Sequence, residues 1–325
     1  MADDILSAPQ DPGQAQLRQD GIDRRGFLEC MAWAGTGVLW TVTGGILSSR
    51  TLAHAGAAEP PPGAFSFVQL SDSHIGFKAA PNQDVTATLR QAIARINALQ
   101  RVPEFVLHTG DLSHSQKPGA FDTVAENLKS LKARQVFYVP GEHDVFADGG
   151  KVYLNRFGAG TKGSGWQSFE YKGVHFVGLV NVLTFKESHL GSLGPDQLDW
   201  LKQDLAGLSA STPIVVFAHV PLWAVYPQWG WATGDGEQAL ALLRRFGSVT
   251  VLNGHIHQVM QKVEGNITFH TAMSTAFPQP PPGGAPSPGP WKQVPEDRVR
   301  TLLGLTTVNY IERQGPLAIV DSTLG

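Results

Sequence analysis

The sequence predicts an α/β fold built around a mixed β-sheet. Short apolar runs of strand length alternate with segments whose apolar residues recur at helical spacing. One pair of runs is joined by Lys172 and Gly173 and is typical of a β-hairpin, which adds an antiparallel strand pair. Apolar residues make up 42% of the 325 residues, so the chain can bury a sizeable core.

The first half of the chain repeats a strand followed by a helix. Strands are expected over residues 65–70, 105–109 and 136–139, where short apolar runs occur. The first expected helix has one apolar face, formed by Val85, Leu89, Ala92, Ile93, Ile96 and Leu99. The second has a similar face, formed by Phe121, Val124, Leu128 and Leu131.

The second half departs from this repeat. Residues 166–171 and 174–180 are expected to form the hairpin, so the sheet is mixed. Gly194 and Pro195 open a helix, because proline suits the first helical position. The remaining expected elements are a strand over 214–218, a helix over 237–246, a strand over 249–252, and closing strands over 302–311 and 317–320.

Residues 278–290 are rich in proline and glycine, which excludes regular structure there. The segment is either a plain surface loop or a rim to the active site, and the sequence favours the surface loop. No internal repeat is seen, and no second domain follows residue 59. Residues 56–325 are therefore expected to form one domain.

The first 55 residues resemble a twin-arginine export signal. Arg24 and Arg25 precede Phe27, residues 31–47 are moderately hydrophobic, and Ala53 and Ala55 offer small residues for cleavage. We therefore expect export by the twin-arginine machinery to the periplasm or beyond. An N-terminal anchor ranks second, because the apolar stretch is shorter than the ~20 residues of a spanning helix. No stable membrane insertion is expected.

Charge and cysteine content exclude several function classes. The net charge of -3 comes from 25 basic and 28 acidic residues without long runs of either sign, so no nucleic-acid polymer is expected as a partner. Cys30 is the only cysteine. Any metal must therefore be held by nitrogen and oxygen ligands.

Five apolar runs each lead into metal-ligand chemistry. The ligand candidates are, in chain order, Asp72 and His74, Asp111, Glu142 with His143 and Asp144, His219, and His255 with His257. Ligands in open α/β sheets bind beyond the carboxyl ends of strands, so the five segments indicate one dinuclear site. A mixed carboxylate and imidazole set indicates transition metals rather than calcium.

The ordered motifs Asp-x-His, Gly-Asp, Gly-Glu-His-Asp, His and Gly-His-x-His resemble those of the calcineurin-like metallophosphoesterase superfamily, over roughly residues 65–275. The resemblance implies a four-layer sandwich of two mixed β-sheets flanked by α-helices. It also implies two divalent or trivalent transition metal ions, iron, manganese or zinc. A small phosphorylated substrate would be hydrolysed by attack of a hydroxide that bridges the metals.

The resemblance also assigns roles to individual residues. The first metal would be held by Asp72, His74 and His257, and the second by His219, His255 and the residue at position 142, with Asp111 as the bridge. His143 would protonate the leaving-group oxygen or stabilise phosphoryl charge. Asp144 would orient His143.

Glu142 departs from the family pattern, which usually has asparagine at this position. A carboxylate there adds negative charge, which should tighten metal binding and make a bridging hydroxide less acidic. One hypothesis is that Glu142 adapts the second site to a more highly charged ion such as ferric iron. Another is that Glu142 does not ligate at all. The alternative function is then an exported metal-binding protein with little or no hydrolase activity.

Substrate contacts are expected from His114 and from an aromatic cluster that follows His219. The cluster comprises Trp223, Tyr226, Trp229 and Trp231. It either stacks on a nucleobase or aromatic leaving group, or simply packs. His114 either touches substrate or lies behind the ligands. The cluster favours a phosphodiester or cyclic nucleotide as substrate, with monoesters as the near alternative.

Overall fold

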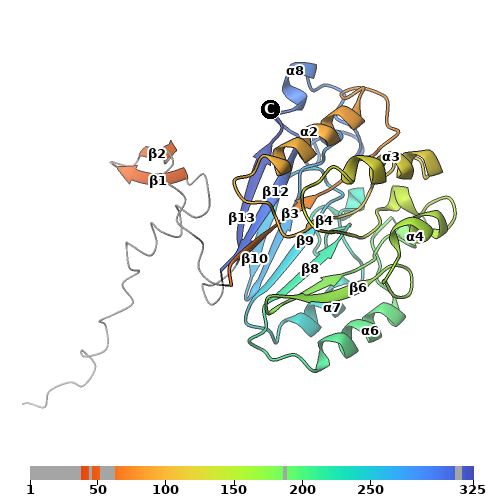
Figure 1. Cartoon of the computed structure of the whole chain (residues 1–325), viewed down its shortest axis with the longest axis vertical. Helices are drawn as coiled ribbons and strands as arrows, with labels where there is room; N and C mark the ends of the chain where they lie inside the picture. Colours follow the sequence, from red (N-terminus) through yellow and green to blue (C-terminus); the bar gives the residue numbers. More distant parts are fainter. Residues whose placement is uncertain (1–37, 44–45, 52–62, 186–188, 312–316) are drawn as a thin grey trace, which may run out of the picture. The chain divides into compact units, whose positions relative to one another are not determined.

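The computed structural model describes residues 38–43, 46–51, 63–185, 189–311 and 317–325 (Figure 1). The chain divides into two compact units, residues 1–60 and 61–325. In the first unit β1 (Val38–Thr43) pairs antiparallel with β2 (Ile46–Thr51). The arginine pair and the cleavage region of the expected export signal lie outside the described residues. No helix in the described ranges is long and apolar enough to cross a membrane.

One sheet of the second unit has five strands in the order β13-β12-β3-β4-β5. The strands are β3 (Phe65–Leu70), β4 (Val106–His108), β5 (Val136–Tyr138), β12 (Gly304–Tyr310) and β13 (Ala318–Thr323). The first three pair in parallel, and β12 runs antiparallel to both of its neighbours. All five strands fall where the sequence predicts them.

The other sheet has six strands in the order β10-β11-β9-β8-β7-β6. The strands are β6 (Gln167–Tyr171), β7 (Val174–Gly178), β8 (Ile214–Ala218), β9 (Val249–Asn253), β10 (Gln261–Glu264) and β11 (Ile267–Thr271). The predicted hairpin is the antiparallel pair β6 and β7. Sequence analysis did not predict β10 and β11. Because every residue of β10 is exposed, that strand has no apolar pattern.

Helices cover the outer faces of both sheets, which gives four layers (Figure 1). The helices α2 (Val85–Asn97), α3 (Pro118–Leu128), α4 (Lys151–Phe157) and α8 (Glu296–Val299) contribute to the core outside the five-stranded sheet. The helices α6 (Pro195–Ala206) and α7 (Gly236–Leu243) pack on the six-stranded sheet. This confirms the expected sandwich of two mixed sheets flanked by helices.

An aromatic core joins the two sheets. Phe67 of β3 stacks on Phe105 with ring centroids 5.2 Å apart, and both rings meet Phe176 of β7 edge-on. Each fully buried side chain of this size contributes roughly 1.5–3 kcal/mol. The two sheets are therefore held face to face, and the ends of their parallel strands are brought together.

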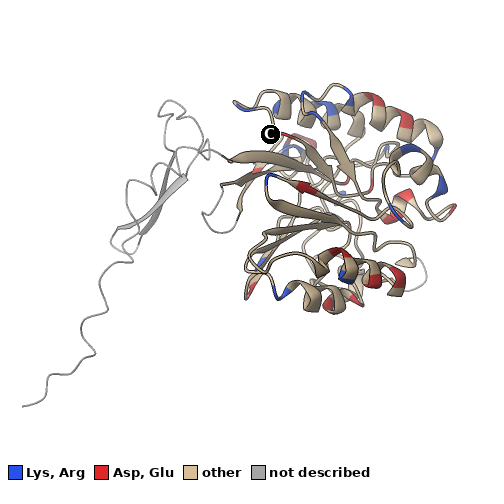
Figure 2. Cartoon of the chain, turned by 60° about the horizontal axis from the view of Figure 1, so that its bottom comes forward, with Lys and Arg blue, Asp and Glu red and all other residues tan. Residues whose placement is uncertain are grey.

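Charged side chains lie mainly on the helices and loops, with both signs on the same elements, while the strands are largely uncharged (Figure 2). The carboxylates at the strand ends are the exception. Asp72, Asp111 and Glu142 are all buried. Burying several carboxylates together is costly unless positive charge accompanies them.

Candidate metal centre

The backbone at the strand ends is left-handed at five of the predicted ligands. The φ angles are 54° at Asp72, 41° at His74, 50° at Asp111, 70° at His255 and 55° at His257. This conformation is uncommon outside glycine, although aspartate and histidine adopt it more often than most residues. It costs on the order of 1–3 kcal/mol per residue and clusters at functional sites. The turns aim these side chains at one point beyond the strands.

Three motif glycines allow the segments to approach closely. A Cβ on Gly141 would overlap Oδ1 of Asp111, and one on Gly254 would overlap the Ser71 hydroxyl. Gly110 has a φ of +98°, and a Cβ there would lie 2.5 Å from Nδ1 of His219. Lack of space therefore requires glycine at all three positions, and at Gly110 the backbone angle requires it as well.

The first predicted group of ligands comes together as a buried triad. Nε2 of His257 lies 3.1 Å from Oδ1 of Asp72 and 3.2 Å from Nε2 of His74. The remaining pair, Nε2 of His74 and Oδ1 of Asp72, is 4.0 Å apart. Ligands held about 2.0–2.1 Å from one ion lie roughly 3–4 Å from one another. The triad therefore has the spacing of a metal site.

Glu142 forms a second buried triad with His219 and His255. Its Oε2 lies 2.8 Å from Nε2 of His219, and its Oε1 lies 3.1 Å from Nδ1 of His255. Four buried atoms of this triad nevertheless make no hydrogen bond of acceptable geometry. They are Oε2 of Glu142, Nε2 of His219 and both ring nitrogens of His255. Buried polar atoms without partners are rare. A cation bound by Oε2 of Glu142, Nε2 of His219 and Nδ1 of His255 would account for three of them.

Asp111 lies between the two triads. Its Oδ2 is 3.4 Å from Nε2 of His74 and 3.5 Å from Nε2 of His219. Its Oδ1 accepts a hydrogen bond from the backbone N–H of His143. One oxygen thus faces both sites and the other is held by the protein, so this carboxylate can bridge two ions through a single oxygen.

The electrostatics of these groups favour bound cations. Burial alone would raise the pKa of Glu142, but His255 and His219 outweigh it and hold that pKa well below its usual range. Burial also opposes ionisation of Asp72, yet His257 and His219 lower its pKa to about 2. The carboxylates are therefore charged donors. Together with the imidazoles they fit a pair of transition metal ions.

The imidazoles of the centre are oriented by groups behind them. Nδ1 of His219 donates to the carbonyl oxygen of Thr109 at 2.7 Å, and Nδ1 of His257 donates to that of Phe277 at 2.5 Å. Because a carbonyl only accepts, Nδ1 carries a proton in each case, and Nε2 is the ring nitrogen that can ligate a metal ion.

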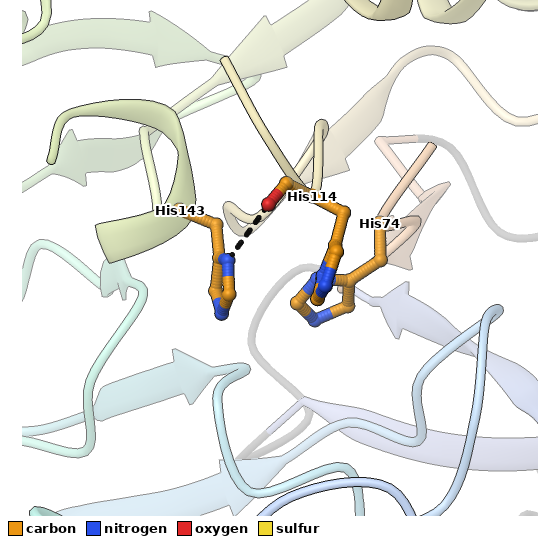
Figure 3. A group of neighbouring side chains, drawn as sticks. All are labelled: His74, His114 and His143. Atoms are coloured by element: carbon orange, nitrogen blue, oxygen red, sulfur yellow. Dashed lines mark hydrogen bonds between the residues drawn. The ribbon is translucent and has the colours of Figure 1, made fainter. Parts of the chain in front are cut away.

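His143 lies beside His114 and the metal ligand His74 (Figure 3). The rings of His143 and His114 stack with centroids 4.7 Å apart, and Nδ1 of His143 donates to the carbonyl oxygen of His114 at 3.0 Å. Burial opposes protonation, but Asp111 and Glu142 outweigh it and raise the pKa of His143. Nε2 is left for a proton transfer. His114 also approaches the metal ligand His74, with their Nδ1 atoms 3.2 Å apart.

Asp144 makes no hydrogen bond to the ring of His143, which it was expected to orient. Its carboxylate accepts backbone hydrogen bonds from Leu112, Ser113 and Gly141 at 2.9–3.0 Å. The bond that orients the His143 ring is made instead by the His114 carbonyl. Asp144 therefore fixes the loop that carries Asp111 to the loop that carries Glu142. Burial and the charge of Asp111 raise its pKa to about 7.

A cavity of about 250 Å³ opens onto both triads. Of the predicted substrate contacts, His114 and Trp229 line it, as does Trp231. Tyr226 packs edge-on against Trp229 with centroids 5.2 Å apart, and Trp223 packs on Phe269 at 4.9 Å. Neither Tyr226 nor Trp223 is among the lining residues.

The structure adds lining residues that sequence analysis did not select. They are Phe185, Phe277, Gln279 and residues 288–290. Gln279 donates from Nε2 to the carbonyl oxygen of His255 at 2.8 Å. The proline-rich segment is therefore a rim to the site and not the plain surface loop that the sequence favoured. Its composition excludes regular structure but carries no signal of where it packs.

Comparison with known proteins agrees with this arrangement. The family model for calcineurin-like phosphoesterases matches residues 65–259. A 3',5'-cyclic-nucleotide phosphodiesterase of Nostoc sp. is 26% identical over 218 residues, which cover 65% of this chain and 79% of that protein. A serine/threonine-protein phosphatase of Danio rerio is 26% identical over 224 residues, covering 60% and 71%.

A solved structure shows the same fold. The crystal structure of a dimetal phosphatase from Danio rerio superposes with a TM-score of 0.60 at 15% identity, covering 80% of this chain and 96% of that one.

Proposed function

Because this chain belongs to the calcineurin-like phosphoesterase family, we propose that it is a phosphodiesterase whose preferred substrates are small phosphodiesters, cyclic nucleotides among them. The chain is a dinuclear metallophosphoesterase. Its alternative function, metal binding without hydrolysis, is not favoured. The preference for a diester over a monoester rests on the charge and shape of the cavity.

The charge of the cavity wall supports a diester. None of the described residues that line it is lysine or arginine. A phosphomonoester carries roughly -1.5 to -2 charges near neutral pH, since its second pKa is about 6, whereas a diester carries only one. Because the wall has no lysine or arginine, a doubly charged monoester is bound less favourably here than in a pocket where an arginine binds the phosphate. The singly charged ester suits this wall better.

The shape of the wall supports a flat leaving group. Phe185 and Trp229 are half-buried and line the cavity together with residues 288–290. Stacking of a base on an aromatic side chain contributes about 1–3 kcal/mol. Phe185 also packs edge-on against the metal ligand His255, with centroids 5.2 Å apart. A nucleobase placed here would lie close to the reacting phosphate.

His143 is the residue that we assign to proton transfer. Its Nδ1 donates to the His114 carbonyl and its side chain lines the cavity, so Nε2 is the ring nitrogen that can pass a proton to the substrate. Donation of that proton to the leaving-group oxygen is general acid catalysis, typically worth about 10²–10⁴-fold. When bound, two transition metal ions supply positive charge to the phosphoryl oxygens and lower the pKa of a coordinated water.

Three finer assignments belong to the same proposal. Iron, manganese or zinc fill the two sites, because the donors are imidazole and carboxylate. Residues 1–55 act as a twin-arginine signal, so that residues 56–325 are the exported domain. The enzyme then works in the periplasm or outside the cell.

Hydrolysis assays on the full chain test the substrate assignment. The protein is loaded in turn with manganese, zinc and iron, and its kcat/KM is measured for cyclic AMP, a chromogenic phosphodiester and the matching monoester. We expect at least about 10-fold higher kcat/KM for the better diester, or roughly 1.4 kcal/mol in transition-state stabilisation. A higher value for the monoester would refute the diester preference. Two bound metals without any hydrolysis would instead support the non-hydrolytic alternative.

A further inference from the structure

The two metal-ligand triads contain the same donors. The first has one carboxylate and two imidazoles, from Asp72, His74 and His257. The second, Glu142 with His219 and His255, also has one carboxylate and two imidazoles. With asparagine at position 142, as the family usually has, the second triad would lack its charge. Glu142 therefore makes the two sites alike.

Asp111 is shared almost equally between the sites. Its Oδ2 lies 3.4 Å from the nearest imidazole of the first triad and 3.5 Å from that of the second. The position of the bridging carboxylate therefore favours neither metal site over the other. Each ion would meet one carboxylate of its own, two imidazoles and half of a shared carboxylate.

The contacts of Glu142 use both oxygens of its carboxylate. Its two oxygens face two different imidazoles, His219 at 2.8 Å and His255 at 3.1 Å. An amide has only one oxygen, so its NH₂ group would be directed at one of these ligand atoms. Oε2 is buried and without a hydrogen-bond partner. The carboxylate therefore lies where a ligand of the second ion would lie.

We propose that Glu142 matches the ligand charge of the two sites, so that the protein binds two divalent ions of the same element with similar affinity. This inference rests on the proposed function for its metal class. Two ions of different charge are favoured when one site has more negative ligand charge than the other, because ligand charge offsets metal charge. Matched triads therefore argue against the ferric and divalent pair that the extra carboxylate suggests when position 142 is considered alone.

Metal titration of the full chain tests the proposal. Metal-free protein is titrated with Mn²⁺ and separately with Zn²⁺, and bound metal is counted by elemental analysis after dialysis against increasing chelator. We expect two ions of the one element to be taken up and then lost together over one range of chelator. Loss of one ion well before the other, or a ferric signature in protein purified from cells, would overturn the proposal.

Glu142→Gln isolates the charge, because it keeps the length of the side chain. We expect this variant to hold one ion at chelator concentrations where the wild type holds two. The second site should weaken by at least about 10–100-fold, the loss typical of groups that only support ligands. Glu237→Gln, at an exposed carboxylate on α7, is the matched control and should behave as the wild type. Unchanged loading of Glu142→Gln would overturn the proposal, and the wild-type titration decides if that variant does not fold.

Hydrolysis is measured on the same samples to separate the two claims. Two matched ions without hydrolysis would refute the proposed function and leave this inference standing. Normal hydrolysis with two unequal sites would refute only this inference.

Discussion

The backbone N–H of His143 donates a 2.9 Å hydrogen bond to Oδ1 of Asp111. The carboxylate that lies between the two triads thus also fixes the residue assigned to proton transfer. Metal binding and acid catalysis depend on the same side chain. Changes to the His143 ring alone can therefore separate the two, because the bond to Asp111 is made by its backbone.

His143→Ala should lower kcat for the best diester by about 10²–10⁴-fold, because it removes the group that protonates the leaving oxygen. The metal content should stay at the wild-type value, since the backbone N–H to Asp111 remains. Steady-state kinetics and elemental analysis on the same preparation measure both. A leaving group of low pKa should restore much of the rate. Equal loss for good and poor leaving groups would contradict the general-acid role.

Gly141→Ala should abolish binding of both metals. Its Cβ would overlap the Asp111 carboxylate and backbone, so the bridging residue must move. Gly119→Ala is the matched control, because a Cβ there meets nothing within 4 Å and the residue lies in α3. That control should bind metal normally and gain about 0.4–1 kcal/mol in the free energy of unfolding. Two metals bound by Gly141→Ala would show that the close approach is not needed.

Ser71→Ala should lower the affinity of the first site for metal by about 10–100-fold, which is the typical effect of removing a group that hydrogen-bonds to a ligand. The Ser71 hydroxyl donates to Oδ2 of Asp72 at 2.5 Å and accepts from Oγ1 of Thr109 at 2.7 Å. Ser73→Ala changes a nearby buried hydroxyl that instead lies 2.8 Å from Nε2 of His108. Calorimetric titration with Mn²⁺ should detect the loss only in Ser71→Ala. Equal affinities in both variants would refute the assignment.

Trp229→Ala should raise KM for a cyclic nucleotide by roughly 10–100-fold, the equivalent of about 1–3 kcal/mol of stacking. KM for a diester without aromatic groups should change little. Trp223→Ala removes a similar ring that packs on Phe269 away from the cavity, and should cost stability without changing KM. The same KM in wild type and Trp229→Ala would rule out stacking on this residue.

The pH dependence of stability should contain a contribution from His175, far from the metal ligands in the sequence. Burial opposes its protonation, but hydrogen bonds with Asp204 at 2.7 Å and Glu170 at 2.5 Å raise its pKa above 6.5. A raised folded pKa gives stability that is complete below the unfolded value. That stability is lost as pH rises through the folded value.

His175→Gln should therefore lower the free energy of unfolding by about 1.5–3 kcal/mol near pH 5.5, the typical contribution of a charge-assisted hydrogen bond. The loss should be smaller near pH 8.5 than near pH 5.5, because the charge of the wild-type imidazole falls as pH rises. Urea denaturation at both pH values measures it. A loss of the same size at both would show that packing, and not charge, explains the effect.

The spacing of apolar residues along the sequence explains most of the helices and strands that were predicted. The strands from β3 to β9 and the helices α2, α3, α6 and α7 follow apolar runs or apolar faces, because each buries one side against a sheet or core. The strands β10 and β11 and the short helices α4 and α8 were not predicted. Strand β10 and the two helices contain few buried residues, so their sequences show no periodic pattern of apolar residues. Strand β11 is largely buried, and its sequence was not recognised as a strand.

The sequence by itself determined the ligand types, their order and their place after parallel strands. Parallel strands end at one edge of a sheet, so ligands that follow them must converge. Only the tertiary structure decided that Asp144 holds two loops together, that Trp229 and not Trp223 reaches the cavity, and that the proline-rich segment forms its rim. Those outcomes depend on contacts between segments distant in the sequence, such as that of Leu112 with Asp144, 32 residues away. A local pattern records which face of an element is buried, but not which distant segment covers it.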